Sequence, residues 1–261
     1  MNKLIFIGGP CVIEHDNNML FEVCKELKRI SKKLDFDFYF KSSFDKANRS
    51  SITSYRGPGL EKSIPILESI KKKLDVRILV DVHNEFQPEK LTDIVDIIQI
   101  PAFLCRQTDL LVSAGKTGKT INIKKGQFVS PEDMLFAVKK IESTGNNNIM
   151  ITERGSSFGY HNLVVDMRSF PIMKKFGYPV IFDSTHSVQL PGGKNGVTGG
   201  QREFIPSLAK AAIAAGADGI FMEIHPDPEC ALCDSTNQFY LSKAEELLTK
   251  LSEIYMVVNN D

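Results

Sequence analysis

Basic side chains stand at the ends of several apolar runs in this sequence. A single lysine in such a place is typical of a solvated loop, but gathering like charges on one surface is costly unless they bind an anion. Lysine acts on a phosphate as a point charge, whereas arginine grips phosphate or carboxylate through two parallel hydrogen bonds. A polyanionic, phosphorylated ligand is therefore predicted for the inner set of donors at strand ends, which is Lys41, Lys124 and Arg154.

A second, outer set of donors indicates a second anionic group. It consists of Asn48, Arg49 and Ser50, in the polar segment that follows Lys46. Arginine and neutral donors of this kind are typical of phosphate binding. We therefore expect two anionic groups to bind, one at each set.

Four further residues have the composition of a transition-metal site: Cys11, His186, Glu223 and Asp234. One thiolate, one imidazole and two carboxylates suit Zn²⁺, Fe²⁺ or Mn²⁺ better than Mg²⁺. The spacing forms no compact ligand motif. A buried cysteine, a paired histidine and two structural carboxylates therefore remain the alternative interpretation.

The elements that must position these residues alternate along the chain. Short β-branched and apolar runs occupy residues 3–8, 37–42, 77–82, 95–100, 119–123, 148–153, 179–184 and 219–224. Apolar residues at helical spacing, such as Leu20, Val23 and Leu27, lie between them. This alternation requires parallel strands, and eight units close into a barrel. The sequence predicts an α/β protein with one (β/α)8 TIM barrel domain, residues 1–261; an open doubly wound sheet is the alternative.

Barrel closure is the condition for the metal site. It pairs the first strand with the eighth and places the seventh beside the eighth, so that the four metal-capable residues meet. Three long irregular segments, 43–59, 186–203 and 225–237, each follow a predicted strand and are expected on the catalytic face. The second holds Gly192, Gly193, Gly196, Gly199 and Gly200, which predict a mobile loop. A helix is predicted to begin at Ser130-Pro131, with Gly145 and Gly177 as helix stops.

Composition narrows the classes of partner and location. The 32 basic and 32 acidic residues give zero net charge, so no overall field attracts nucleic acid or an anionic membrane. Signal-peptide features and membrane-length apolar runs are absent from the sequence, which favours a cytoplasmic protein. The five cysteines are irregularly spaced, so reduced thiols are expected. Cys230 and Cys233 form a C-x-x-C pair, but a zinc ribbon or a thioredoxin-like site needs partners that the sequence lacks.

Six motifs resemble those of one enzyme family, and they occur in its order and at similar spacing. They are GPCVIE (9–14), KSSFDKANRSS (41–51), QIPAFL (99–104), TERG (152–155), FDSTHSVQ (182–189) and EIHPDP (223–228). The family is that of the 3-deoxy-D-manno-octulosonate 8-phosphate synthases, and the resemblance runs nearly end to end. It implies a homotetrameric barrel that condenses phosphoenolpyruvate with D-arabinose 5-phosphate and water, releases inorganic phosphate and supplies lipopolysaccharide assembly.

The resemblance also implies a role for each candidate residue. Cys11 corresponds to the metal-dependent branch of the family, in which one divalent ion per subunit is held by Cys11, His186, Glu223 and Asp234. The inner set together with Lys46 and Gln99 resembles the phosphoenolpyruvate site. The outer set resembles the sugar-phosphate site, which Arg106 of a neighbouring subunit completes. Expected catalytic residues are Lys41, Lys46, Lys124, Arg154 and His186. His83 and His186 are alternative groups for proton transfer.

Two alternatives concern the reaction itself. A related family makes 3-deoxy-D-arabino-heptulosonate 7-phosphate from erythrose 4-phosphate and shares the GPC start, but it reads KPRTS after the second strand where this chain reads KANRSS (46–51). A catalytically silent sugar-phosphate sensor on the same fold is the other. The sequence departs from the resembled family at DSTN (234–237), in place of DGPS or DGPN. The geometry of that loop is therefore not predicted.

Overall fold

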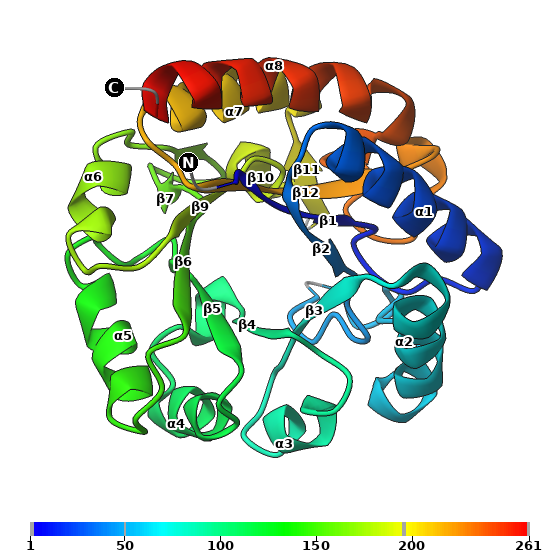
Figure 1. Cartoon of the computed structure of the whole chain (residues 1–261), viewed down its shortest axis with the longest axis horizontal. Helices are drawn as coiled ribbons and strands as arrows, with labels where there is room; N and C mark the ends of the chain where they lie inside the picture. The colour runs from blue at the N-terminus through cyan, green and yellow to red at the C-terminus, as the bar shows by residue number, and fades with distance from the viewer. Residues whose placement is uncertain (1–2, 50, 195–196, 260–261) are drawn as a thin grey trace.

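Parallel strands close into a ring that helices surround (Figure 1). The computed structural model describes residues 3–49, 51–194 and 197–259. Within them the ring runs in the order β1 (Ile5–Gly9), β2 (Asp37–Lys41), β3 (Arg77–Asp81), β4 (Ile97–Ile100), β5 (Thr120–Lys124), β6 (Ile149–Glu153), β9 (Val180–Asp183) and β12 (Gly219–His225). β1 pairs with β12 from Ile5↔Gly219 to Gly9↔Glu223. This pairing confirms the predicted TIM barrel, and the open-sheet alternative is wrong.

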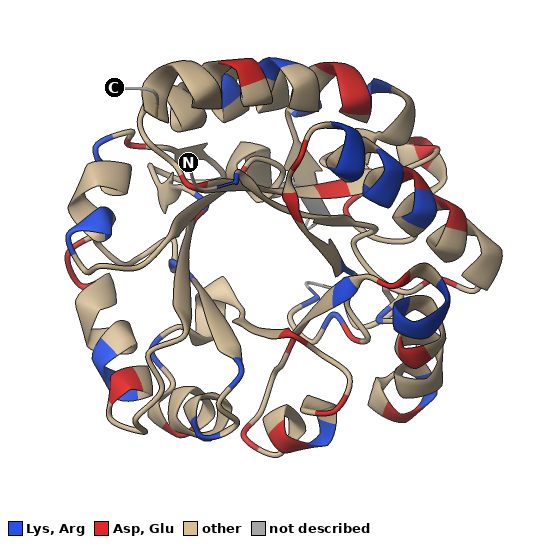
Figure 2. Cartoon of the chain, viewed as in Figure 1, with Lys and Arg blue, Asp and Glu red and all other residues tan. Residues whose placement is uncertain are grey.

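Helices cover the outside of the ring. They are α1 (Asn17–Lys33), α2 (Leu60–Leu74), α3 (Gln87–Leu91), α4 (Thr108–Lys116), α5 (Met134–Glu142), α6 (Ser169–Lys174), α7 (Ile205–Ala214) and α8 (Leu241–Asn259). Their outer faces carry Lys and Arg mixed with Asp and Glu, most visibly on α1 and α8 (Figure 2). No helix in the described ranges is both long and apolar enough to cross a bilayer.

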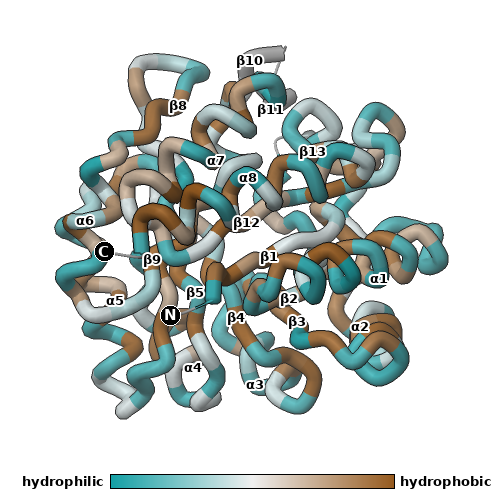
Figure 3. Tube along the Cα trace, turned by 45° about the horizontal axis from the view of Figure 1, so that its top comes forward, coloured by the Kyte–Doolittle hydropathy of each residue, from teal (hydrophilic) through white to brown (hydrophobic). Residues whose placement is uncertain are grey.

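Apolar side chains fill both the space under the helices and the inside of the ring. In the tube view, brown segments concentrate along the strands and teal segments at the periphery (Figure 3). Inside the ring, a buried layer is formed by Ile7, Tyr39, Leu79, Ile97, Met150, Ile181 and Phe221. β5 adds the buried Asn122, which donates to Thr152 Oγ1 at 2.7 Å. This packed layer closes the ring at this level, and active sites of such barrels lie at the carboxyl ends of the strands.

Two local predictions need correction. The glycine-rich part of segment 186–203 contains β10 (Gln189–Lys194) and β11 (Val197–Gly200), which pair antiparallel; Gly196 lies outside the described residues. Glycine has low strand propensity, so this hairpin gives little sequence signal. The predicted helix start at Ser130 is also early. The Ser130 hydroxyl accepts from the Asp133 N–H at 3.2 Å, but this caps a turn, and α5 begins at Met134.

Candidate active site

A cavity of about 620 Å³ opens at the carboxyl ends of the barrel strands. Segments 43–59 and 225–237 border it, as does β10. Nine predicted site residues line it: Lys41, Lys46, Asn48, Arg49, Gln99, Lys124, Arg154, His186 and Asp234. The described members of the inner and outer donor sets therefore lie around one cavity.

Lys41, which is buried, and Lys46, which is partly buried, face the same carboxylate. Lys41 is the last residue of β2, and its Nζ lies 3.1 Å from Glu223 Oε1, while Lys46 Nζ lies 3.4 Å from the same oxygen. Burial, and then the neighbouring Lys46, lower the pKa of Lys41. A Cβ at Gly9 would overlap the Lys41 carbonyl oxygen, so only glycine allows β1 and β2 to approach here. This close approach sets Lys41 beside the residues that follow β1.

Arg154 follows β6 and is almost completely buried. Its Nη2 donates to Gln189 Oε1 at 2.6 Å, whereas its Nη1 is buried without a hydrogen-bond partner. Gln99 Oε1, at the end of β4, is also buried and unpaired. Buried polar groups are normally satisfied, so an unpaired donor and an unpaired acceptor on two residues that line the cavity indicate that a ligand completes their hydrogen bonds.

The outer set lies beside the metal-capable residues. Arg49 Nη1 is 3.4 Å from Asp234 Oδ1, and Arg49 Nε donates to the Tyr55 carbonyl at 3.2 Å. Asn48 lines the same cavity. Ser50, the third member, lies outside the described residues.

Arg106 is placed away from the other candidates. It is exposed in the turn between η1 (Ala102–Leu104) and α4, and its carbonyl accepts from Lys140 Nζ at 2.8 Å. It is not among the residues that line the cavity. Its predicted role concerned a neighbouring subunit, so that role stays a prediction.

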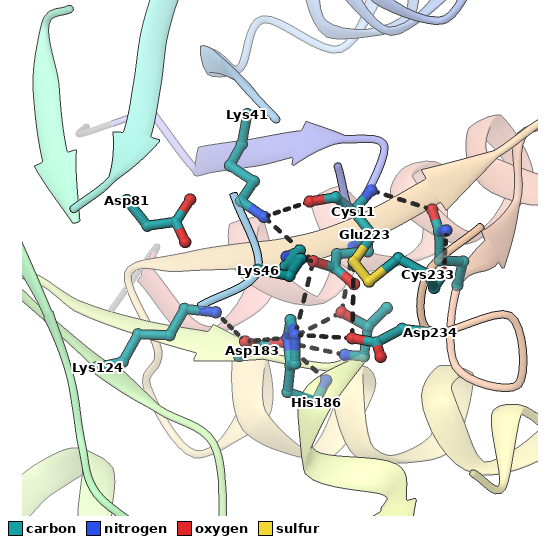
Figure 4. A network of polar contacts seen from close by, with 12 residues as sticks. Cys11, Lys41, Lys46, Asp81, Lys124, Asp183, His186, Glu223, Cys233 and Asp234 are labelled. Carbon is teal, nitrogen blue, oxygen red and sulfur yellow. Dashed lines mark hydrogen bonds and ion pairs between the residues drawn. A yellow bond between two sulfur atoms is a disulfide. The ribbon is translucent and has the colours of Figure 1, made fainter. Parts of the chain in front are cut away.

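The four metal-capable residues converge from distant parts of the chain (Figure 4). His186 Nε2 lies 3.6 Å from Glu223 Oε1 and 3.7 Å from Asp234 Oδ2, and Cys11 Sγ lies 3.6 Å from Asp234 Oδ2. Tetrahedral ligands at the usual metal–ligand lengths are about 3.3–3.8 Å apart. His186, Glu223 and Asp234 therefore present donor atoms close enough to share one divalent ion such as Zn²⁺, Fe²⁺ or Mn²⁺, and Cys11 lies beside this group through its contact with Asp234.

Cys233 joins this cluster, which the sequence did not predict. Its sulfur lies against that of Cys11, and the two Cα atoms are 6.2 Å apart, a separation that a disulfide can span. The expectation that the cysteines are reduced stays a prediction for this pair. The 222 residues between the two hide the contact in the sequence, and barrel closure creates it. A thiolate is required to bind a metal, so ion binding at Cys11 needs the reduced pair.

Asp183 orients the imidazole of His186. Its Oδ2 lies 2.7 Å from His186 Nδ1, and its Oδ1 accepts from the His186 N–H at 2.9 Å. This arrangement leaves Nε2 facing Glu223 and Asp234, as in carboxylate–histidine–metal triads. Asp183 also pairs with Lys124. Although burial opposes its ionisation, His186 and Lys124 hold the pKa of Asp183 well below its usual range.

Glu223 is the charge centre of the mouth. It is buried, and burial by itself would raise its pKa. The surrounding Lys46, His186 and Lys41 reverse that effect and hold the pKa of Glu223 well below its ordinary value. The carboxylate is therefore ionised at neutral pH and available as a cation ligand.

Sequence reasoning missed three residues that shape the site: Asp183, Gln189 and Cys233. Asp183 and Gln189 lie inside the motif FDSTHSVQ, so their position was visible but their contacts were not. Cys233 directly precedes Asp234, and this adjacency was the signal that could have identified it.

The fold and the site define a (β/α)8-barrel enzyme with a cationic, metal-capable mouth at the carboxyl ends of its strands. The chain belongs to the DAHP synthetase I family, whose model matches residues 1–259.

Curated relatives are similar over almost the whole chain. It is 56% identical to a 2-dehydro-3-deoxyphosphooctonate aldolase of Desulfotalea psychrophila, over 98% of this chain and 91% of the relative. It is 55% identical to the protein of that name from Geobacter sp. strain M21, over 98% of this chain and 93% of the relative. The Cyanothece sp. PCC 7425 protein of the same name is 54% identical, over 95% of this chain and 90% of the relative.

Proposed function

We propose that the protein condenses phosphoenolpyruvate with D-arabinose 5-phosphate and water, forming 3-deoxy-D-manno-octulosonate 8-phosphate and inorganic phosphate. The observation that carries the proposal is that members of both donor sets line one cavity together with His186 and Asp234 of the metal-capable cluster. The relatives' name contains an eight-carbon phosphorylated acid, which favours this product over the seven-carbon one.

In the proposed reaction, carbon 3 of phosphoenolpyruvate attacks the aldehyde carbon of the sugar while water adds at carbon 2. The resulting phosphate hemiketal then loses inorganic phosphate by cleavage of its C–O bond. Phosphoenolpyruvate is held in this proposal by Lys41, Lys46, Gln99, Lys124 and Arg154. Holding the enol near the aldehyde and neutralising its phosphate and carboxylate supply much of the acceleration.

The sugar phosphate binds, in this proposal, at Asn48, Arg49 and Ser50. Cys11, His186, Glu223 and Asp234 would hold one Zn²⁺, Fe²⁺ or Mn²⁺, a choice supported by the spacing of their donor atoms. A bound ion supplies Lewis acidity, which polarises the aldehyde or lowers the pKa of the attacking water. His83, whose Nε2 is 3.1 Å from Asp81 Oδ2, is the alternative group for proton transfer because it is not a metal ligand.

Release of inorganic phosphate tests the reaction. We expect the enzyme with phosphoenolpyruvate to release phosphate when D-arabinose 5-phosphate is added, and much more slowly with erythrose 4-phosphate. A preference for erythrose 4-phosphate would overturn the proposal in favour of the heptulosonate reaction. If no phosphate is released with either sugar, the catalytically silent sensor is favoured.

Arg49 gives a test of the two-set arrangement. Arg49→Ala should raise the KM for arabinose 5-phosphate about 10- to 100-fold, because a charge-assisted contact with phosphate is worth about 1.5–3 kcal/mol. The KM for phosphoenolpyruvate should change little. Arg56→Ala is the matched control, since Arg56 lies in the same loop but pairs with Asp45 at the surface. Equal effects of Arg49→Ala on both KM values would refute the assignment.

Lys124 gives a pH dependence. Burial lowers its pKa to about 8, a shift that Asp183 only partly opposes. The cation is present below this pH and lost above it, so kcat/KM for phosphoenolpyruvate should fall as pH rises through about 8. The fall in kcat should come at higher pH, because a bound anion raises the pKa. In Lys124→Arg the guanidinium stays charged, and an alkaline limb unchanged in that variant would contradict the prediction.

We further propose a homotetramer in the cytoplasm, with Arg106 reaching a neighbouring subunit. Support comes from large exposed aromatic side chains in or near the successive loops after β4, β5 and β6: Phe103, Phe128, Phe136, Phe158 and Tyr160. Exposed apolar groups on this scale are typical of interaction surfaces. Light scattering should give four times the 29.2 kDa chain mass; a monomer mass at micromolar concentration would contradict the tetramer.

A further inference from the structure

Cys11 and Cys233 lie side by side, but the proposed reaction uses only Cys11, as a metal ligand, and gives Cys233 no role. Both side chains are buried, and their Cα separation of 6.2 Å lies within the range that a disulfide requires. Cys11 lies just after β1, and Cys233 lies in the segment after β12. Figure 4 shows the two sulfur atoms beside Asp234 and Glu223.

The Gln238 side chain links the backbones of the two cysteines, and this link does not depend on a bond between the sulfurs. The side-chain amide of Gln238 accepts from the Cys11 N–H at 3.2 Å and donates to the Cys233 carbonyl at 2.8 Å. Gln238 is fully buried, so water does not compete for these hydrogen bonds. The reduced thiols are therefore expected to stay adjacent.

A structural staple does not explain this pair. Disulfides serve mainly small domains that cannot bury an adequate core, and a barrel of 261 residues buries a large one. Cys24, Cys105 and Cys230 are free in the described part of the chain. The Cys11–Cys233 pair lies instead at the metal-capable cluster, because the ligand atoms of Cys11, Cys233 and Asp234 are close enough to share one ion.

The disulfide and the ion exclude each other at Cys11. A sulfur in a disulfide is no longer a thiolate, and the thiolate is the form that binds a metal. Loss of Cys11 leaves only His186, Glu223 and Asp234, one imidazole and two carboxylates. Oxidation of the pair should therefore weaken ion binding strongly.

We propose that Cys11 and Cys233 are a reversible redox switch that controls occupancy of the metal site, with a hydroperoxide as oxidant. This inference rests on the metal site of the proposed function. Cys233 lines the cavity, so a small oxidant reaches it from the substrate side. Hydrogen peroxide converts the Cys233 thiol to a sulfenic acid and releases water. The Cys11 thiolate then attacks that sulfenic sulfur, so that the S–S bond forms as the S–O bond breaks and hydroxide leaves; an ion held at Cys11 would lose this ligand.

The test uses the full-length protein, reduced and loaded with Zn²⁺, and the same protein reduced and metal-free. Both are treated with hydrogen peroxide, after which peptide mapping locates disulfides, thiols are counted in denaturant, and released Zn²⁺ is measured. We expect the five thiols to fall to three, a Cys11–Cys233 linkage in both samples, and Zn²⁺ release in step with its formation. Dithiothreitol should restore five thiols and Zn²⁺ binding.

Three variants separate the pair from general oxidation. Cys230→Ser should behave as the parent protein, because Cys230 is exposed and its thiol donates a hydrogen bond to Asp227 rather than contacting the pair. Cys233→Ser should form no linkage, and its Cys11 should progress to sulfinic acid, which dithiothreitol does not reverse. Gln238→Met removes both backbone contacts at similar size, so it should slow disulfide formation while the thiol count of the untreated protein stays at five.

The outcomes separate the two proposals. Separate oxidation of Cys11 and Cys233 in the metal-free protein, without a linkage, would overturn the switch and leave the metal site intact. Disulfide formation with Zn²⁺ retained would also overturn it. Failure of the reduced protein to bind Zn²⁺, Mn²⁺ or Fe²⁺ would overturn the metal site, and control of its occupancy with it, even if the disulfide formed.

Discussion

Removal of the divalent ion should abolish turnover. Under reducing conditions, a chelator such as dipicolinate is expected to lower kcat at least about 10³-fold, since a bound ion contributes several kcal/mol of charge stabilisation. Added Zn²⁺, Mn²⁺ or Fe²⁺ should restore it. The reason is the spacing of the donor atoms of His186, Glu223, Asp234 and Cys11, which fits a single ion. The measurement is phosphate release before and after chelation, with the metal content determined in parallel.

Variants of the ligands provide the control for chelation. His186→Ala should lose both the ion and activity, and Asp183→Asn should weaken ion binding about 10- to 100-fold, because Asp183 orients the imidazole. His15→Ala is the matched variant, as His15 is exposed and lies outside the cluster. Full activity in metal-free protein would contradict the metal assignment.

Arg154→Met should lower kcat/KM for phosphoenolpyruvate about 10²- to 10³-fold. The buried guanidinium belongs to the cavity lining, and its Nη1 has no hydrogen-bond partner among the described residues, so the proposed anion would supply one. Truncating one member of a buried charge pair costs about 2–5 kcal/mol, because the other charge is left uncompensated. Methionine fills a similar volume without the charge. Steady-state kinetics with phosphoenolpyruvate varied at saturating arabinose 5-phosphate give the value.

Two comparisons show whether the loss comes from the anion contact. Arg154→Lys should recover part of the activity, since the charge remains but the two-pronged geometry does not. Arg168→Met should have little effect, because Arg168 is exposed and pairs with Asp166 outside the mouth. A loss in Arg154→Met accompanied by a matching drop in Tm would instead indicate that Arg154 supports the fold rather than the substrate.

The barrel could be predicted because the sequences of its strands are continuous apolar runs. Strands buried on both faces of a parallel ring need no polar alternation, so 3–8 or 219–224 stand out from the amphipathic helices. Each observed barrel strand overlaps its predicted run. Segment 186–203 was harder, because glycines at β11 carry no strand signal even though Gln189 and Gly200 pair.

The metal-capable cluster could be predicted only through the topology. The sequence shows no compact ligand motif for its four residues. Pairing of β1 with β12 closes the barrel and makes neighbours of Cys11, His186, Glu223 and Asp234. The same closure brings Cys233 to Cys11, a contact that no local pattern encodes. Contacts such as Asp183 with Lys124 depend on side-chain directions within the packed mouth, which the sequence does not specify.

Anomalous diffraction from crystals of the reduced protein, grown with Mn²⁺ and phosphoenolpyruvate, tests the proposed site most directly. We predict one Mn²⁺ peak per subunit, within coordination distance of Cys11, His186, Glu223 and Asp234. The phosphoenolpyruvate phosphate or carboxylate should lie against Arg154 and Lys124. A Mn²⁺ peak away from these four residues, or phosphoenolpyruvate bound outside the barrel mouth, would contradict the proposed site.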